Sequence, residues 1–159
     1  MSAPTENPAT AGHTARARFD SAAPGGYKRL AAVSQWLADG GVDPTLLHLI
    51  DMRVSQLNGC AYCLDMHAQE AREAGETQQR LDVLAGWDET GLFTEAEKAV
   101  LAWAEALTRV GEKRAPQALY DTLAEYYDER EIAGITLAIA MMNAWNRLAV
   151  GLGKEPEGR

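Results

Sequence analysis

The sequence predicts an all-α protein. Apolar residues recur at the three- and four-residue spacing of a helix face, most clearly between Leu46 and Leu57. No useful length of chain alternates apolar and polar residues with the two-residue period of a strand, and β-branched residues form few clusters. Proline, glycine and capping residues interrupt the apolar pattern, and these interruptions divide the chain into about six to seven helices.

Turn residues delimit the first helices. One helix is expected over about residues 26–38, because its apolar residues repeat at helical spacing until Gly40. The next is expected over about residues 44–57, because Pro44 suits the first turn of a helix and Asn58, followed by glycine, breaks the pattern.

Capping patterns mark the remaining helices. A helix is expected from about residue 60 to 75, and Thr77 can cap the one that follows. The Thr-Glu-Ala-Glu sequence at Thr94 is a capping-box pattern. Two further helices are expected over about residues 116–126 and 128–150. The last is apolar on most sides, which predicts burial in the monomer or at a subunit interface.

Composition favours one domain with a real core. The chain has 159 residues and is 47% hydrophobic. We expect a disordered tail over residues 1–18 and a single helical domain over residues 19–153. The net charge of −8 disfavours nucleic acid and anionic membranes as partners. We find no signal-peptide pattern, and the longest nearly uncharged stretch, residues 132–146, is too short to span a bilayer, so we expect a cytoplasmic protein.

The most informative segment contains the only two cysteines, Cys60 and Cys63, spaced C-x-x-C and followed by His67. With Cys60 in the first turn of a helix, Cys63 lies about 60° and His67 about 20° from it around the axis, so the three share one face. The helix start favours thiolate at both sulfurs, and His67 can accept the proton of Cys63 one turn away. This arrangement predicts a redox-active thiol pair.

Other interpretations of the pair remain open at this point. The cysteines could be buried structural residues. They could also bind zinc with His67 and His48, although three of these ligands crowd onto one helix face. Thioredoxin-like chemistry needs a βαβ setting that the sequence does not predict.

Four segments resemble one known family. The segment from Arg53 to His67 resembles the signature of the alkylhydroperoxidase AhpD-like, carboxymuconolactone decarboxylase family. The similarity continues through residues 71–76, 101–108 and 143–149. The resemblance implies an AhpD-like helical bundle that assembles as homotrimers or homohexamers, with no metal and no organic cofactor.

The resemblance also implies residue roles and partners. Cys63 would attack a hydroperoxide and Cys60 would resolve the product, with His67 as the family histidine. His48 stands where many members carry a relay glutamate, and a histidine can also move protons. The reductant would be a lipoyl- or thioredoxin-type protein. We therefore expect a thiol peroxidase in antioxidant defence, with a thiol–disulfide oxidoreductase, a redox sensor or, less favoured, a structural zinc-binding oligomer as alternatives.

Overall fold

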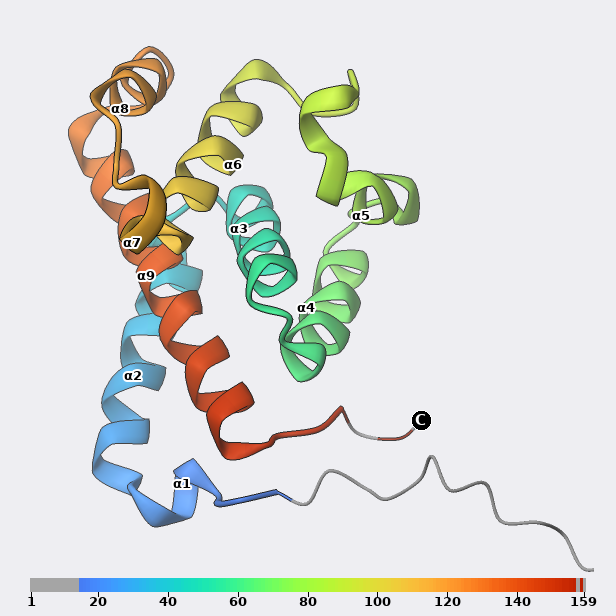
Figure 1. Cartoon of the computed structure of the whole chain (residues 1–159), viewed down its shortest axis with the longest axis vertical. Coiled ribbons are helices and arrows are strands. Elements are labelled where there is room, and N and C mark those ends of the chain that lie inside the picture. Colours follow the sequence, from blue (N-terminus) through green and yellow to red (C-terminus); the bar gives the residue numbers. More distant parts are fainter. Residues whose placement is uncertain (1–14, 157, 159) are drawn as a thin grey trace, which may run out of the picture.

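The computed structural model describes residues 15–156 and 158, and within these it contains helices and no strands (Figure 1). This confirms the predicted all-α class. Most of the tail expected over residues 1–18 lies outside the described residues. The elements are α1 (Phe19–Ala22), α2 (Pro24–Trp36), η2 (Leu37–Gly41), α3 (Pro44–Asn58), α4 (Ala61–Glu73), α5 (Gln78–Val83), η3 (Leu84–Glu89), α6 (Glu95–Thr108), α7 (Val110–Lys113), α8 (Gln117–Ala124) and α9 (Glu129–Leu152).

The predicted helices are all present, together with two additional single turns, α1 and α7, of four residues each. Capping side chains set several boundaries. The Asp43 carboxylate accepts hydrogen bonds from two backbone N–H groups at the start of α3. The predicted capping box at Thr94 starts α6, and a second capping box, at Asp128, starts α9. Gly59, with φ of 64°, ends α3 in the left-handed conformation that glycine adopts readily.

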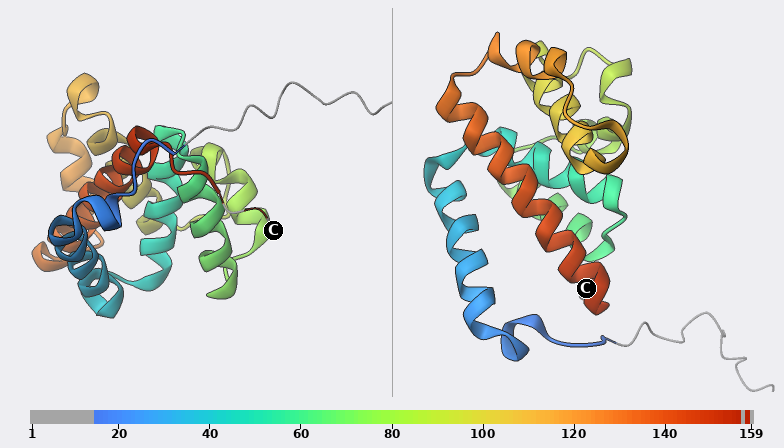
Figure 2. Two further views of the ribbon diagram at one scale, coloured as in Figure 1. Left: turned by 90° about the horizontal axis from the view of Figure 1, so that it is seen from below. Right: turned by 60° about the vertical axis from the view of Figure 1, so that its left-hand side comes forward.

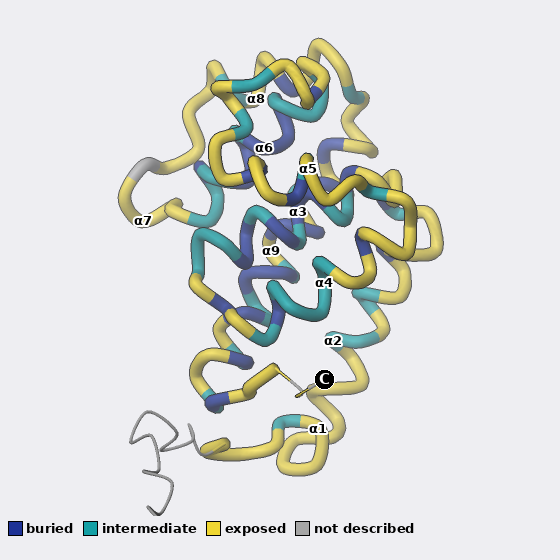
Figure 3. Tube along the Cα trace, turned by 90° about the vertical axis from the view of Figure 1, so that its right-hand side faces the viewer, coloured by how far each residue is buried: buried dark blue, intermediate teal, exposed yellow. Residues whose placement is uncertain are grey.

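Helix α3 is the centre of the fold. It packs against α9, α6 and α4, and most of the buried residues belong to these four helices (Figure 3). α4 turns back along α3 after Gly59, so the segment that carries both cysteines lies against the central helix. Side chains at one turn of α3 can therefore meet side chains of α4.

Helix α9 meets, by length and composition, the criterion for a helix that crosses a membrane. A buried core helix meets the same criterion. The buried residues of α9, such as Ile135, Ile139 and Met142, belong to the larger hydrophobic core. Its contacts with α3 and α6 place it as a core helix of the bundle.

Helices α1 and α2 pack more loosely against α9 (Figure 2). No residue of α2 is fully buried. The rings of Phe19, Tyr27 and Trp145 meet edge to face with centroids 5.8–6.3 Å apart. Trp145 also donates a hydrogen bond from Nε1 to Ser34 Oγ at 2.9 Å, so an aromatic cluster joins this arm to the core helix.

Two partly buried polar networks fix α3 against its neighbours. The Asn58 side-chain amide donates to the Oδ1 atoms of Asn143 and Asn146 on α9, at 3.0 and 2.9 Å. On another side of α3, Arg53 binds Glu105 of α6 with Nη2–Oε1 at 2.6 Å. Because both networks lie close to the end of α3 in sequence, they hold the turn that leads into Cys60.

Candidate functional site

The two cysteines form a disulfide at the start of α4, with Cα atoms 5.3 Å apart. Cys60 has an extended backbone conformation and is the N-cap of α4, so the helix begins one residue later than the sequence suggested. Its Sγ accepts a hydrogen bond from the backbone N–H of Cys63 at 3.3 Å. The helix start therefore provides an N–H donor to the Cys60 sulfur, an interaction that stabilises negative charge there.

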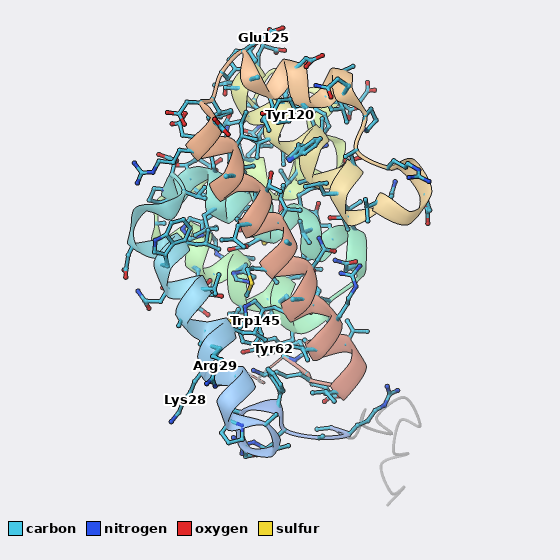
Figure 4. The ribbon with its side chains drawn as sticks, turned by 90° about the vertical axis from the view of Figure 1, so that its left-hand side faces the viewer. Lys28, Arg29, Tyr62, Tyr120, Glu125 and Trp145 are labelled. Atoms are coloured by element: carbon cyan, nitrogen blue, oxygen red, sulfur yellow. A yellow bond between two sulfur atoms is a disulfide. The ribbon has the colours of Figure 1, made fainter. Side chains whose placement is uncertain are left out.

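Both cysteines are buried, with 1% and 2% of their surface exposed. Tyr62, between them in sequence, is half-buried, and the ammonium group of Lys154 lies 3.8 Å from the centre of its ring. Figure 4 shows Tyr62 near the end of the molecule where α9 finishes. A substrate or reductant can therefore reach the sulfurs only past the residues that cover this turn, such as Tyr62 and Lys154.

His67 faces two carboxyl groups. Its Nδ1 lies 2.8 Å from Oε2 of Glu70 on the same helix and 3.7 Å from Oδ2 of Asp51 on α3. The His67 side chain is only 11% exposed. Within the described residues, His67 makes no hydrogen bond to either sulfur of the disulfide. The predicted shared face placed Cys60 in the first turn of the helix, whereas Cys60 is the extended N-cap, and only Cys63 and His67 lie one turn apart on α4 itself. The carboxyl partners of the histidine were not predicted.

The surroundings of these groups shift their pKa values in opposite directions. Burial raises the pKa of Asp51 to about 7 against the lowering effect of His67. Burial lowers the pKa of His67, but the hydrogen bond with Glu70 and the charges of Asp51 and Glu70 outweigh it and raise the pKa above its usual 6.5. The hydrogen bond with His67 lowers the pKa of Glu70. Glu70 is therefore an ionised acceptor at neutral pH, so Nδ1 of His67 carries the proton and Nε2 of the neutral ring is a base.

His48 lies one helical turn before Asp51 on α3. Burial lowers its pKa, while the charges of Glu70 and His67 act on it in opposite directions. Its Nδ1 is the one buried side-chain nitrogen or oxygen in the described part of the chain that lacks a hydrogen-bond partner. The structure thus places His48 in the electrostatic surroundings of His67. The lowered pKa favours its neutral form at neutral pH.

Asp51 was not among the residues predicted from the sequence. A signal was present, because an aspartate between Leu49, Ile50 and Met52 interrupts an apolar stretch of α3 and lies one turn after His48. Its contact with His67 depends on how α3 packs against α4, which one sequence does not reveal.

In the part of the chain described, no group of three or more His, Cys, Asp or Glu side chains has the arrangement of a metal site.

Comparisons with known proteins agree with this architecture. The sequence model of the carboxymuconolactone decarboxylase family matches residues 21–106. The uncharacterized protein YdfG of Bacillus subtilis is 38% identical over 138 residues, which cover 87% of this chain and 94% of YdfG.

Solved structures show the same fold. ATU0492 of Agrobacterium tumefaciens, a protein of unknown function whose name proposes an AhpD antioxidant defence role, is 35% identical with a TM-score of 0.89, covering 92% of this chain and all of that one. The alkylhydroperoxidase AhpD core of a peroxidase-related protein from Ralstonia eutropha JMP134 is 20% identical with a TM-score of 0.76, covering 87% and 74% of the two chains. The present chain belongs to the AhpD-like, carboxymuconolactone decarboxylase family.

Proposed function

We propose that the protein is a thiol peroxidase that reduces hydroperoxides through Cys63 and Cys60. The observation that carries the proposal is a disulfide-forming pair at the start of a helix, with a carboxylate-supported histidine one turn after the second cysteine. The antioxidant name of the Agrobacterium structure, at 35% identity, supports it. His67 is the base in this proposal, and His48 contributes to its electrostatic surroundings.

The reaction needs only these groups, a hydroperoxide and a dithiol reductant. Nε2 of His67 takes the thiol proton of Cys63, and the thiolate attacks the terminal peroxide oxygen and breaks the O–O bond. The alkoxide leaves with the proton from His67 as an alcohol, and Cys63 becomes a sulfenic acid. The Cys60 thiol then attacks the Cys63 sulfur and expels water, which gives the disulfide seen in the structure.

The hydrogen bond from the Cys63 backbone to Cys60 Sγ gives the two sulfurs different roles in regeneration. A reductant thiolate that attacks the Cys63 sulfur displaces Cys60, whose thiolate is stabilised by that N–H group. The second reductant thiol then releases Cys63. We propose a lipoyl- or thioredoxin-type dithiol protein as the reductant, because the cycle needs two electrons and two protons.

We also propose that the chain assembles as a homotrimer or homohexamer in the cytoplasm. An open, mostly apolar groove on the outer side of α9 supports assembly, with Ala133, Leu137 and Ala140 beside Tyr120 of α8. Leu137 is 37% exposed although it lies on an otherwise core-forming helix. Sedimentation at micromolar concentration tests this, and a monomer would contradict it.

A second candidate function is disulfide exchange without efficient peroxide turnover. The position at which many family members carry a relay glutamate is His48 here, and its Nδ1 has no hydrogen-bond partner. A weaker relay slows peroxide attack but leaves the reversible disulfide intact.

The deciding experiment gives reduced protein a measured amount of cumene hydroperoxide and counts thiols before and after. We expect one peroxide to be consumed per chain with loss of both thiols. Cys60→Ser should still consume one equivalent and stop at a sulfenic acid, whereas the matched variant Cys63→Ser should consume none. Retained consumption in Cys63→Ser would refute the assignment. Unreacted thiols in the parent protein, with a measurable disulfide potential, would favour the exchange function, and thiols that titrate only after chelation would indicate zinc.

A further inference from the structure

Four ionisable side chains meet where α3 faces α4. His48 and Asp51 come from successive turns of α3, and His67 and Glu70 from successive turns of α4. The charge of Glu76, after α4, also acts on His48. The proposed reaction uses only His67 from this cluster, so the role of the others needs a separate explanation.

Asp51 is the member whose position is hardest to explain by stability. Its side chain is 15% exposed, and its neighbours in sequence, Ile50 and Met52, are buried at 0% and 5% exposure. Among the described residues its one ion-pair partner is His67, at 3.7 Å, and it makes no side-chain hydrogen bond there. A largely buried carboxyl group with so little compensation destabilises the fold, so its presence at this position needs another reason.

Glu70 is closer to His67 but differs in two respects. Its side chain is 48% exposed, so water weakens its effect on the charge of the ring. It also lies on the same helix as His67, so it cannot fix that helix relative to α3. Asp51 is the carboxyl group that reaches the ring from the helix ending at the Cys60 turn.

We infer that Asp51 is a positioning residue, which orients the His67 ring from α3 and stabilises its protonated form after the ring takes the thiol proton. This inference rests on the proposed function. When Nε2 accepts the proton from Cys63, the ring becomes an imidazolium between two carboxylates. The Nδ1 proton stays in the hydrogen bond with Glu70, and Asp51, whose side chain is 15% exposed, exchanges its own proton with solvent. A pKa near 7 suits a group that gains and loses a proton at neutral pH.

The test uses a readout that needs no peroxide. In a Cys60→Ser background, the reduced protein has one thiol, and its alkylation by iodoacetamide is followed from pH 5 to 9. Asp51→Asn should slow alkylation at pH 7 by roughly tenfold. The pKa of His67, measured by NMR, should fall by about one pH unit, which is the shift that corresponds to a tenfold change. Asp51→Glu should restore the rate to within about threefold of the parent, because it returns a carboxylate. Glu70→Gln should have a smaller effect than Asp51→Asn.

The matched control is Asp82→Asn, which removes an exposed carboxylate of α5 that is bonded to Gln78. It should leave the alkylation profile unchanged. The inference is overturned if the thiol of Asp51→Asn is alkylated at the parent rate, or if Glu70→Gln slows alkylation more than Asp51→Asn does. It is also overturned if Asp51→Asn lowers the rate equally at all pH values and leaves the His67 titration unchanged, because a merely structural role would have that effect. If the alkylation results are as expected but the parent protein consumes no peroxide, the positioning role of Asp51 stands and the peroxidase function is rejected.

Discussion

Replacing Asp51 with asparagine should stabilise the protein at neutral and alkaline pH, although the substitution removes a side chain that we place beside the reacting groups. The reason is the cost of ionising a carboxyl group whose side chain is only 15% exposed to water between α3 and α4. Asparagine has nearly the same shape as a protonated aspartic acid and carries no charge. The substitution therefore removes the ionisation cost with little change in packing.

The magnitude follows from the pKa of Asp51. Burial raises it from 3.8 to about 7, with the attraction of His67 already included. A folded state that holds a proton more tightly than the unfolded state has its full stability below pH 3.8 and loses stability as pH rises to about 7. At ~1.4 kcal/mol per pH unit, the upper limit of that loss is ~4 kcal/mol. Since partial exposure and relaxation reduce it, we expect Asp51→Asn to be more stable than the parent by about 2–4 kcal/mol at pH 8.

The assay is urea unfolding of the disulfide form of both proteins at pH 4 and pH 8. Protein concentration is held constant, because the stability of an oligomer depends on it. The two proteins should differ by less than ~1 kcal/mol at pH 4, where Asp51 is protonated in the folded state. If Asp51→Asn is the less stable protein at pH 8, or if the difference does not change with pH, burial of Asp51 is not costly and the reasoning fails.

Two further substitutions test the packing around α3 and α9. A Cβ atom added at Gly134 would lie 2.5 Å from the carbonyl oxygen of Gly41, so Gly134→Ala should cost about 1–3 kcal/mol in urea unfolding. The control Gly151→Ala meets no atom within 4 Å and should not be destabilising, and equal losses in the two variants would refute the close approach. Asn58→Ala leaves the Oδ1 atoms of two α9 asparagines without its amide and should cost ~2 kcal/mol, with faster hydrogen exchange in the Cys60 turn. A change below ~0.5 kcal/mol would contradict this, because it is typical of a surface site.

The helices could be predicted from sequence because their ends depend on local chemistry. Pro44 and the capping box at Thr94 act on the residues next to them in sequence, so the starts of α3 and α6 were predicted closely. The single turns α1 and α7 were missed because four residues are too short for a periodic pattern. The expected end of the 26–38 helix was close, because Asp39 and Gly40 leave the helical conformation and Gly40 has a positive φ of 108°.

The candidate site was predictable only in the part that one helix determines. The shared face of Cys63 and His67 follows from 3.6 residues per turn, and the cysteine spacing allows the disulfide. The contact of Asp51 with His67 follows from the packing of two helices, which needs tertiary structure. Asn58, expected to serve the turn and the start of the next helix, also binds α9 through its side chain.

The polar side chains of α3 separate into two groups by how fully they are bonded. Asn58, Ser55 and Arg53 face α9 or α6, and each has short hydrogen bonds that explain its position by stability. Towards α4, Asp51 has only a 3.7 Å contact and His48 has an unpartnered buried nitrogen. A buried polar group without good partners costs free energy of folding. The side of α3 that faces α4 is therefore destabilising relative to the sides that face α9 and α6. That side also faces the histidine that follows the disulfide, which is why the poorly bonded groups point to proton transfer and the well-bonded groups to structure.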